Sequence, residues 1–268
     1  MIPKVMIILG SASDKEIALK SIKILEKLQI ERRVVVSELS SLYDVSEETI
    51  RRDLDKLESE GLVVKSYGGA VLNENANLEL PFNIRKNKNV VGKQKIAELI
   101  SQMVRDGENI FLDASSTAVA IAKAIKSRKD ITIITNSLQI AIELLEEPNC
   151  KVISTGGVAI ESSFALVGQV TDRTISSYYA DKAIISSKGF DLQAGFTDSD
   201  ERHATNKKSM LEGARTKILA VDSSKFNRIS FAKIGDFRDI TTVVTDVKPE
   251  EEWLEVFAKY NIECIYPE

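Results

Sequence analysis

The sequence predicts an α/β fold class with two domains, on three observations. Residues 15–73 show helical spacing followed by two short β segments, whereas residues 90–268 alternate short apolar runs with amphipathic helical stretches. Such a change of pattern is typical of a domain boundary. The chain has 268 residues, 43% of them hydrophobic, which is enough to bury two modest cores. Residues 74–89 begin in a polar stretch that suits a linker.

Composition excludes several classes of protein. The 36 Lys and Arg residues stand against 40 Asp and Glu, so the formal charge is −4 and any contact with DNA must be local. The longest apolar run, Val5–Leu9, is far shorter than the roughly 20 residues of a membrane span, and it is also too short for a signal peptide. We therefore expect a cytoplasmic protein without a membrane partner.

The two cysteines give no sign of a metal site. Cys150 and Cys264 lie far apart and have no His or Cys at metal-ligand spacing. We expect two buried thiols in a reducing compartment, and neither a metal nor a cofactor.

The first domain contains two short helices joined by a tight turn. Ser37–Tyr43 is the first of them, Asp44–Val45 makes the turn, and Ser46 caps a second helix that runs through Glu60 and ends at Gly61. On the second helix the apolar side chains fall at i, i+4 and i+7, namely Ile50, Leu54 and Leu57. This stripe faces the core and leaves the opposite side for a partner.

The outward side of this second helix suits DNA. At about 100° per residue, four polar or basic side chains lie on that side or on its flanks: Thr49, Arg51, Arg52 and Lys56. In a helix-turn-helix the second helix enters the major groove, where arginines bind guanine or phosphate. The alternative is an ordinary solvated face, which the acidic residues Glu47, Glu48, Asp53 and Asp55 favour. Periodicity alone leaves both open.

A predicted wing follows this helix. Leu62–Leu72 contains two β segments around a glycine turn. A tip carrying Lys65, Tyr67, Gly68 and Gly69 can approach a phosphate closely.

Residues 36–62, closed by Tyr67-Gly-Gly-Ala-Val71, resemble the winged helix-turn-helix of the DeoR family of bacterial transcriptional regulators. The resemblance implies that Ser46, Thr49, Arg51 and Arg52 face double-stranded operator DNA, and that Lys65, Tyr67 and Gly68 form the wing. Because operators repeat with protein symmetry, we expect a homo-oligomer, a dimer or a tetramer.

The second domain carries five apolar runs that predict buried parallel strands, at residues 109–113, 131–135, 151–154, 182–186 and 217–221. Two helical stripes supply covering helices: Ile96, Leu99, Ile100 and Met103, and then Leu138, Ala141, Ile142 and Leu145.

Polar residues follow several of these strands, where α/β sheets bind ligands. Asp113–Thr117 and Thr135–Ser137 each stand between a strand and a helix, and Ser154–Gly157 is a glycine loop. Lys188-Gly189 and Ser223–Lys225 add positive charge. Each motif alone is also typical of a simple cap or turn, but the repetition predicts a sugar-phosphate pocket.

The same segments resemble the DeoR-family effector domain, whose fold is similar to that of ribose-5-phosphate isomerase and glucosamine-phosphate deaminase. The resemblance implies an anion loop of Asp113, Ser115, Ser116 and Thr117, with further ligand contacts from Asn136, Gly156, Gly157, Lys188 and Lys225. Many members have Gly in place of Ser115 and an acid in place of His203. We expect His203 to be solvated in a loop or helix entrance, the alternative being that it reaches the ligand.

We therefore expect a DNA-binding regulator, a repressor of sugar-metabolism genes controlled by a phosphorylated sugar, and not an enzyme. Whether the sugar induces or co-represses stays open. The alternative function is a sugar-phosphate isomerase or deaminase that uses Asp113, Asp181 or Asp191 as its acid or base. Residues 1–14 resemble the opening strand of carboxyaminoimidazole ribonucleotide mutase, and we interpret them as an atypical N-terminal extension.

Overall fold

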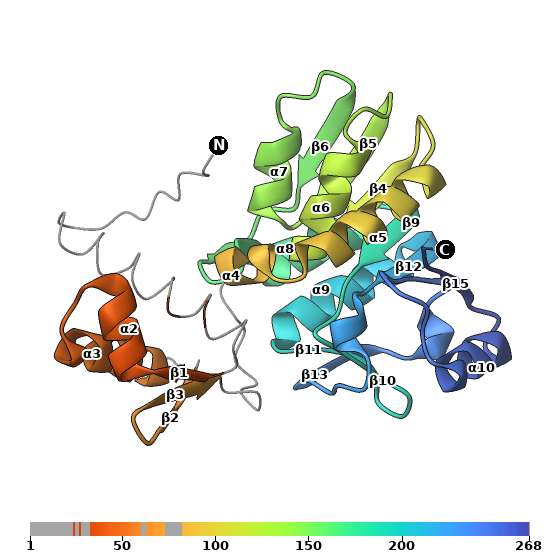
Figure 1. Ribbon diagram of the computed structural model, residues 1–268. Helices are drawn as coiled ribbons and strands as arrows, with labels where there is room; N and C mark the ends of the chain where they lie inside the picture. Colours follow the sequence, from red (N-terminus) through yellow and green to blue (C-terminus); the bar gives the residue numbers. More distant parts are fainter. Residues whose placement is uncertain (1–23, 25–26, 28–32, 60–62, 73–81, 268) are drawn as a thin grey trace. The chain divides into compact units, whose positions relative to one another are not determined.

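The computed structural model describes residues 24, 27, 33–59, 63–72 and 82–267. It divides into two compact units, Met1–Leu80 and Pro81–Glu268 (Figure 1). The predicted extension, residues 1–14, lies outside the described residues. Of the helix expected over residues 15–28, only Ile24 and Lys27 are described, and both are helical.

The first unit is a helix-turn-helix with a small sheet. Its elements are β1 (Arg33–Val35), α2 (Val36–Tyr43), α3 (Glu47–Ser59), β2 (Val63–Ser66) and β3 (Gly69–Leu72), and the sheet order is β1-β3-β2 with antiparallel pairing. The two predicted helices and the wing are therefore present. The additional strand β1 pairs Val35 with Gly69, where a Cβ would lie 1.9 Å from the Val34 carbonyl oxygen. Glycine at this position permits the third strand.

The turn and the core of the first unit follow the sequence pattern. Asp44 ends α2 in the left-handed conformation at φ 51°. The predicted stripe of α3, Ile50, Leu54 and Leu57, is at most 2% exposed, and Ile24 and Leu39 are equally buried.

The second unit is built on a parallel sheet of seven strands within the described residues, in the order β15-β14-β12-β9-β4-β5-β6. In chain order these strands are β4 (Asn109–Leu112), β5 (Ile131–Thr135), β6 (Cys150–Ser154), β9 (Ala180–Ile185), β12 (Ala214–Ala220), β14 (Thr242–Val244) and β15 (Glu263–Ile265). The five predicted strands are all confirmed as members of this sheet.

Helices cover both faces of the sheet. One core contains buried side chains of α4 (Phe82–Asn87), α5 (Val90–Met103), α6 (Ser116–Ile125) and α7 (Leu138–Leu144), and the other contains those of α8 (Gln169–Ser176), α9 (Glu201–Glu212) and α10 (Glu251–Lys259). Alternate residues of β4 divide between the two cores, Ile110 and Leu112 in the first and Phe111 in the second.

Short strands outside the main sheet complete the second unit. β7 (Val158–Ile160) and β8 (Ala165–Val167) form a hairpin, and β10 (Gly189–Asp191), β11 (Gly195–Asp198) and β13 (Ala232–Gly235) form a three-stranded sheet. Two 3₁₀ turns, η1 (Ser223–Lys225) and η2 (Phe237–Asp239), follow β12 and β13.

The predicted buried stripe of α7 is wrong. Ile142 and Leu145 are 68% and 77% exposed, and the buried side chains are Ile140 and Leu144. The helix packs beside β6, the last strand of the sheet, so apolar side chains on its outer side have no layer to cover them among the described residues.

The expected linker, residues 74–89, differs from the structure in its second half. Residues 82–87 form α4, and Phe82 is 1% exposed. Its ring meets that of Phe164 edge-on at 5.7 Å, and its backbone N–H donates to the Ser162 carbonyl oxygen at 2.7 Å. This anchor makes α4 part of the second unit.

The expectations about membrane-spanning helices and about the two cysteines can be compared with the fold. None of the helices in the described ranges is long and apolar enough to cross a membrane. Cys150 and Cys264 are only half-buried, in contrast to the buried thiols that we expected.

Candidate DNA-binding surface and ligand crevice

The predicted DNA-reading side chains lie on the outer side of α3. Arg51, Arg52 and Lys56 are exposed, and Thr49 is half-buried. Ser46 begins the helix, because its Oγ accepts a hydrogen bond from the Thr49 N–H at 3.2 Å. Its Oγ also lies 2.9 Å from Thr49 Oγ1. The exposed basic side chains therefore share one surface that starts at a capped helix end.

Several acidic residues of α3 do not act as free surface charges. Asp53 is 4% exposed and turns toward the interior. Glu47 pairs with Arg51 at 2.6 Å, with both side chains about half exposed. A pair of this kind contributes only about 0–1 kcal/mol, so Arg51 can exchange it for a DNA phosphate or base at little cost.

The wing places Tyr67 and Gly68 at its tip, with Tyr67 fully exposed. Lys65 differs from the expectation, because it lies in β2 rather than at the tip. Its ammonium pairs with the carboxylates of Asp55 and Glu58 on α3. The hydrogen bond that Lys65 donates to Asp55 raises the pKa of Lys65. Lys65 therefore joins the wing to α3.

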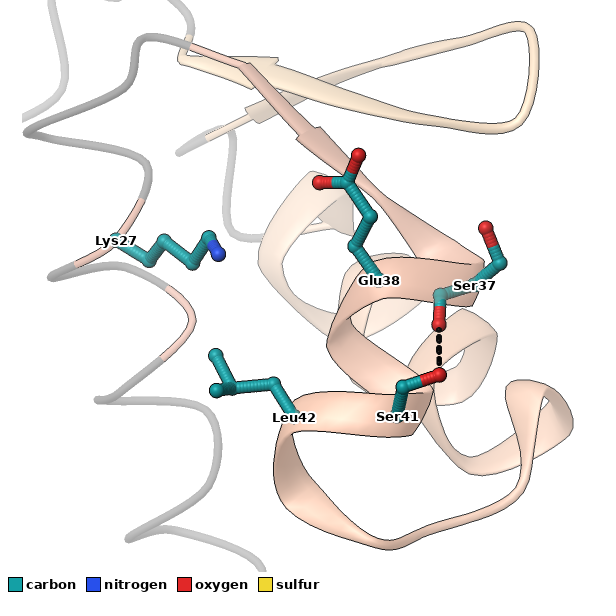
Figure 2. A pocket seen from close by; sticks show the side chains of 5 residues that line it. All are labelled: Lys27, Ser37, Glu38, Ser41 and Leu42. Carbon is teal, nitrogen blue, oxygen red and sulfur yellow. Dashed lines mark hydrogen bonds between the residues drawn. The ribbon is translucent and has the colours of Figure 1, made fainter.

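An open pocket lies beside α2, and Figure 2 shows its lining side chains. These are Lys27, Ser37, Glu38, Ser41 and Leu42. The Ser41 hydroxyl donates to the Ser37 carbonyl oxygen at 3.0 Å. One cation, one carboxylate and one 57% exposed leucine give the pocket a mixed chemistry that does not select an anion.

The candidate ligand site of the second unit lies where the strand order of the parallel sheet reverses. From β4 the chain continues to β5 and β6 on one side of the sheet, whereas β9, β12, β14 and β15 follow on the other side. The carboxyl ends of β4 and β9 are therefore the switch point, where open α/β sheets bind their ligands.

Asp113, the residue after β4, organises this point. Its Oδ1 accepts hydrogen bonds from the Ser115 hydroxyl at 2.6 Å and the Ser115 N–H at 3.1 Å. Its Oδ2 accepts from the Ser186 N–H at 3.0 Å and lies 3.2 Å from Lys207 Nζ. Both carboxylate oxygens are thus engaged by the protein, which suits Asp113 to positioning the loop.

Lys207 on α9 is the central residue that sequence reasoning missed. Its ammonium lies 2.5 Å from Asp198 Oδ2 and donates to the Ser186 carbonyl oxygen at 2.8 Å. The three side chains of Lys207, Asp113 and Asp198 are almost completely buried. Lys207 lowers the pKa of Asp198 against the opposing effect of burial. The available signal was a lysine between apolar positions of a helix, since Ala204 and Met210 are also buried.

Three buried polar atoms of the second unit lie on residues at strand ends or on α9 and have no partner in the described part of the chain. Asn136 Oδ1, Ser187 Oγ and Asn206 Oδ1 have no hydrogen-bond partner among the described residues. The two amide nitrogens both donate to the Leu166 carbonyl oxygen, at 3.0 Å and 3.1 Å. Buried polar atoms are normally satisfied, so this arrangement offers two acceptors and one hydroxyl to a polar ligand.

His203 is not the solvated residue that we expected. It lies in the first turn of α9, is 5% exposed, and acts electrostatically on Asp198 and Asp200. Because it stands one helical turn before Lys207, it faces the same interior.

The first turn of α6 presents hydrogen-bond donors at the same edge of the sheet. The Ser115 hydroxyl caps the helix by accepting from the Ala118 N–H at 3.0 Å. Ser116 and Thr117 are the first two helical residues and are 8% and 4% exposed. Backbone N–H groups at such positions have no intrahelical acceptor and suit an anion.

The remaining predicted contacts are spread along the same edge of the sheet. Gly157 has φ 119°, and a Cβ there would lie 2.2 Å from Thr171 Oγ1. Thr171 in turn donates to the Gly156 carbonyl oxygen at 2.7 Å, so this glycine loop packs against α8. Lys188 follows β9, is half-buried and lowers the pKa of Asp198.

Lys225, after β12, belongs to a group of basic residues. Burial lowers its pKa despite Asp222, and Lys88, Arg228 and Arg85 lower it further. Lys93 on α5 also acts on Asp222. Its own pKa is lowered to about 8 by burial, opposed by Asp222 and reinforced by Lys225, Arg85 and Lys88. We call these five cations, Arg85, Lys88, Lys93, Lys225 and Arg228, the basic cluster.

The basic cluster lies at the carboxyl edge of the sheet. Asn89, just before α5, donates from Nδ2 to Asp246 Oδ2 at 3.1 Å, and Asp246 follows β14. The backbone N–H of Ser223, after β12, donates to the other oxygen of Asp246 at 2.7 Å. These bonds hold the start of α5 and the ends of two strands together.

The carboxylates proposed for an enzyme do not assemble. Asp181 accepts from the Asn109 N–H at 2.9 Å, at the amino ends of β9 and β4, which is the opposite edge from the candidate ligand site. Asp191 accepts from the N–H groups of Gln193 and Ala194 in the β10–β11 turn. Asp198, held by Lys207, has a lowered pKa, whereas a general base needs a raised one. In the parts of the chain that are described, no cluster of His, Cys, Asp and Glu suits a metal ion.

Comparison with known proteins agrees with both units. Residues 21–76 match the DeoR-like helix-turn-helix domain, and residues 88–247 match the DeoR C-terminal sensor domain. A ribose-5-phosphate isomerase from Methanocaldococcus jannaschii shows a partial likeness, with a TM-score of 0.37 and 17% identity over 50% of this chain and 53% of that chain.

Two relatives match along most of their length. The helix-turn-helix transcriptional regulator YulB of Bacillus subtilis is 41% identical over 84% of this chain and 86% of that protein. The glycerol-3-phosphate regulon repressor of Escherichia coli is 28% identical over 90% of this chain and 95% of that protein. Both relatives are named as regulators of transcription rather than as enzymes. With both of its domains matched, the chain belongs to the DeoR family of transcriptional regulators.

Proposed function

We propose that this protein represses genes of sugar metabolism, and that a sugar phosphate bound at the carboxyl edge of the parallel sheet sets its affinity for operator DNA. The observation that carries the proposal is the group of unpartnered buried atoms beside Lys207, on Asn136, Ser187 and Asn206. A sugar presents several hydroxyl groups, which donate to amide oxygens and exchange hydrogen bonds with a serine hydroxyl.

The charges along this edge orient the ligand. The basic cluster lies at the end of β12, and β9 separates β12 from β4. Two strand spacings amount to about 10 Å, so one small ligand can reach from the basic cluster to the Asp113–Lys207 ion pair. We propose that the phosphate binds near Lys93, Lys225 and the first turn of α6, and that the sugar hydroxyls bind Asn136 and Asn206.

Related proteins support a role in carbohydrate control. The glycerol-3-phosphate regulon repressor of Escherichia coli is named for a phosphorylated polyol. An effector can change DNA affinity only if it prefers one conformation, and a coupling of about 1–3 kcal/mol changes affinity about 5–150-fold. A cytoplasmic homo-oligomer, at least a dimer, fits operators with symmetric half-sites.

Calorimetric titration of the full-length protein with a panel of sugar phosphates tests this function. We expect one of them to bind, and the matching unphosphorylated sugar to bind more weakly. Asn206→Leu removes an unpartnered acceptor and should weaken binding, whereas Thr205→Ala, at the exposed neighbouring position, should not. If no sugar phosphate binds, or if Asn206→Leu binds as tightly as the wild type, the proposed ligand site is wrong.

A further inference from the structure

The side chain of Lys93 connects the basic cluster to α4. It is 6% exposed, and its ammonium donates to two backbone carbonyl oxygens, those of Arg85 and Lys88. Carbonyl groups in the last turn of a helix have no intrahelical donor, so Lys93 serves as the C-terminal cap of α4 from the neighbouring helix. Phe82 anchors the other end of α4 in the core.

The position of α4 in the chain connects this cap to the DNA-binding unit. Only residues 73–81 separate α4 from β3, the last strand of the DNA-binding unit. Any change in the order of α4 therefore acts on the point where the connection from the DNA-binding unit enters the sensor domain.

The charge around Lys93 makes the cap sensitive to an anion. Asp222 favours the charged amine, while Lys225, Arg85 and Lys88 oppose it, and all of these groups face Lys93 from the end of β12 or from α4 and its C-terminal turn. An ammonium has three donors, of which two bind α4. Among the described residues no acceptor binds the third donor, so an anion can bind it and would also offset the repulsion among the cations.

We propose that Lys93 couples anion binding at the basic cluster to the order of α4, so that a bound phosphate tightens the capped turn through which the DNA-binding unit is joined. The identity of the natural anion, a sugar phosphate, rests on the proposed function. Because linkage is reciprocal, an ordered α4 must also favour the anion. Lys93 acts here as a positioning residue, with one side chain shared by the ligand and the backbone of α4.

Hydrogen exchange of the full-length protein, in phosphate and in chloride at matched ionic strength, tests the coupling. We expect phosphate to slow exchange of the amides of residues 82–89 about tenfold, as one additional charge-assisted hydrogen bond implies. Lys93→Gln should abolish this slowing. Lys95→Gln, an exposed lysine on the same helix, should leave it intact.

A further variant separates the coupling from the overall stability of the fold. Lys225→Gln removes a cation but keeps both bonds from Lys93 to α4, so it should need more phosphate to reach the same slowing. If phosphate binds, as judged by a raised Tm, and exchange of residues 82–89 stays unchanged, the coupling is wrong while the proposed function stands. The coupling is also overturned if Lys93→Gln shows the wild-type slowing. Failure of phosphate and of every sugar phosphate to bind overturns both proposals.

Discussion

The ammonium of Lys207 lies 3.2 Å from the carboxylate of Asp113, and this pair joins helix α9 to the loop after β4 across the switch point of the sheet. Asp198 lies on the other side of the same ammonium, at 2.5 Å. Lys188 also acts on Asp198, so two cations face the two carboxylates. The ion pairs therefore hold the strand ends and α9 in place around the unpartnered atoms of Asn136 and Asn206.

Removing Lys207 should destabilise the sensor domain strongly. Lys207→Met leaves Asp113 and Asp198 buried without their cation, and breaking a buried pair in this way costs about 3–5 kcal/mol. Urea unfolding of the purified protein measures the change. Lys208→Met, at the exposed neighbouring position, is the matched control and should lie within about 0.5 kcal/mol of the wild type.

Arg51→Ala should weaken operator binding and leave ligand binding intact. A base contact by an arginine contributes about 1–3 kcal/mol, so we expect roughly a 5–150-fold loss of affinity. Fluorescence anisotropy at one fixed salt concentration measures the affinity for DNA, and calorimetry measures the affinity for the ligand. Glu47→Gln releases Arg51 from its surface partner and should bind DNA at least as tightly as the wild type. If Arg51→Ala binds DNA as tightly as the wild type, Arg51 does not contribute to the DNA interface.

Thr117→Ala should weaken the binding of the sugar phosphate and leave DNA binding unchanged. The loss of one hydrogen bond from the first turn of α6 corresponds to about 0.5–1.5 kcal/mol, which calorimetry resolves. The opposite pattern, with DNA binding lost and ligand binding kept, would contradict the assignment of this turn to the ligand.

Affinity for the sugar phosphate should fall as the pH rises through about 8. Burial lowers the pKa of Lys93 to about 8, so its ammonium loses the proton there, and a neutral amine attracts the phosphate less. Below about pH 6 the phosphate dianion takes up a proton and becomes a monoanion, so affinity should fall again. Lys93→Met should remove the alkaline fall but keep the acidic one. An alkaline fall that persists in Lys93→Met would assign it to another group.

The sequence predicts the parts of this protein that follow a clear period. The strands β4, β5, β6, β9 and β12 each contain a short apolar run, and the helix-turn-helix combines a helical stripe with a capped turn. By contrast, β1, β14 and β15 have three residues each, too few to show a pattern. The face of α7 could not be predicted because its burial depends on the position of α7 beside the edge strand β6.

The candidate site also contains residues that the sequence predicts and residues that it does not. Loops after strands are visible in the sequence, and Asp113, Ser115 and Asn136 lie at the predicted edge of the sheet. Lys207 and Lys93 were missed because each lies in a helix, where an isolated lysine is usually a solvated residue. Only the packing of α9 and α5 shows that these two side chains are buried. Lys65 was predicted at the wing tip. Its pairing with Asp55 and Glu58 on α3 forms only in the folded structure, so the sequence does not show it.

Control of DNA binding by a sugar phosphate is the central claim, and one titration tests it most directly. DNA from upstream of the protein's own gene is labelled, bound by the full-length protein, and followed by fluorescence anisotropy while sugar phosphates are added one at a time. We predict that one sugar phosphate changes the affinity for this DNA about 5–150-fold and that Asn206→Leu responds less. Tight DNA binding that no sugar phosphate alters would contradict the claim.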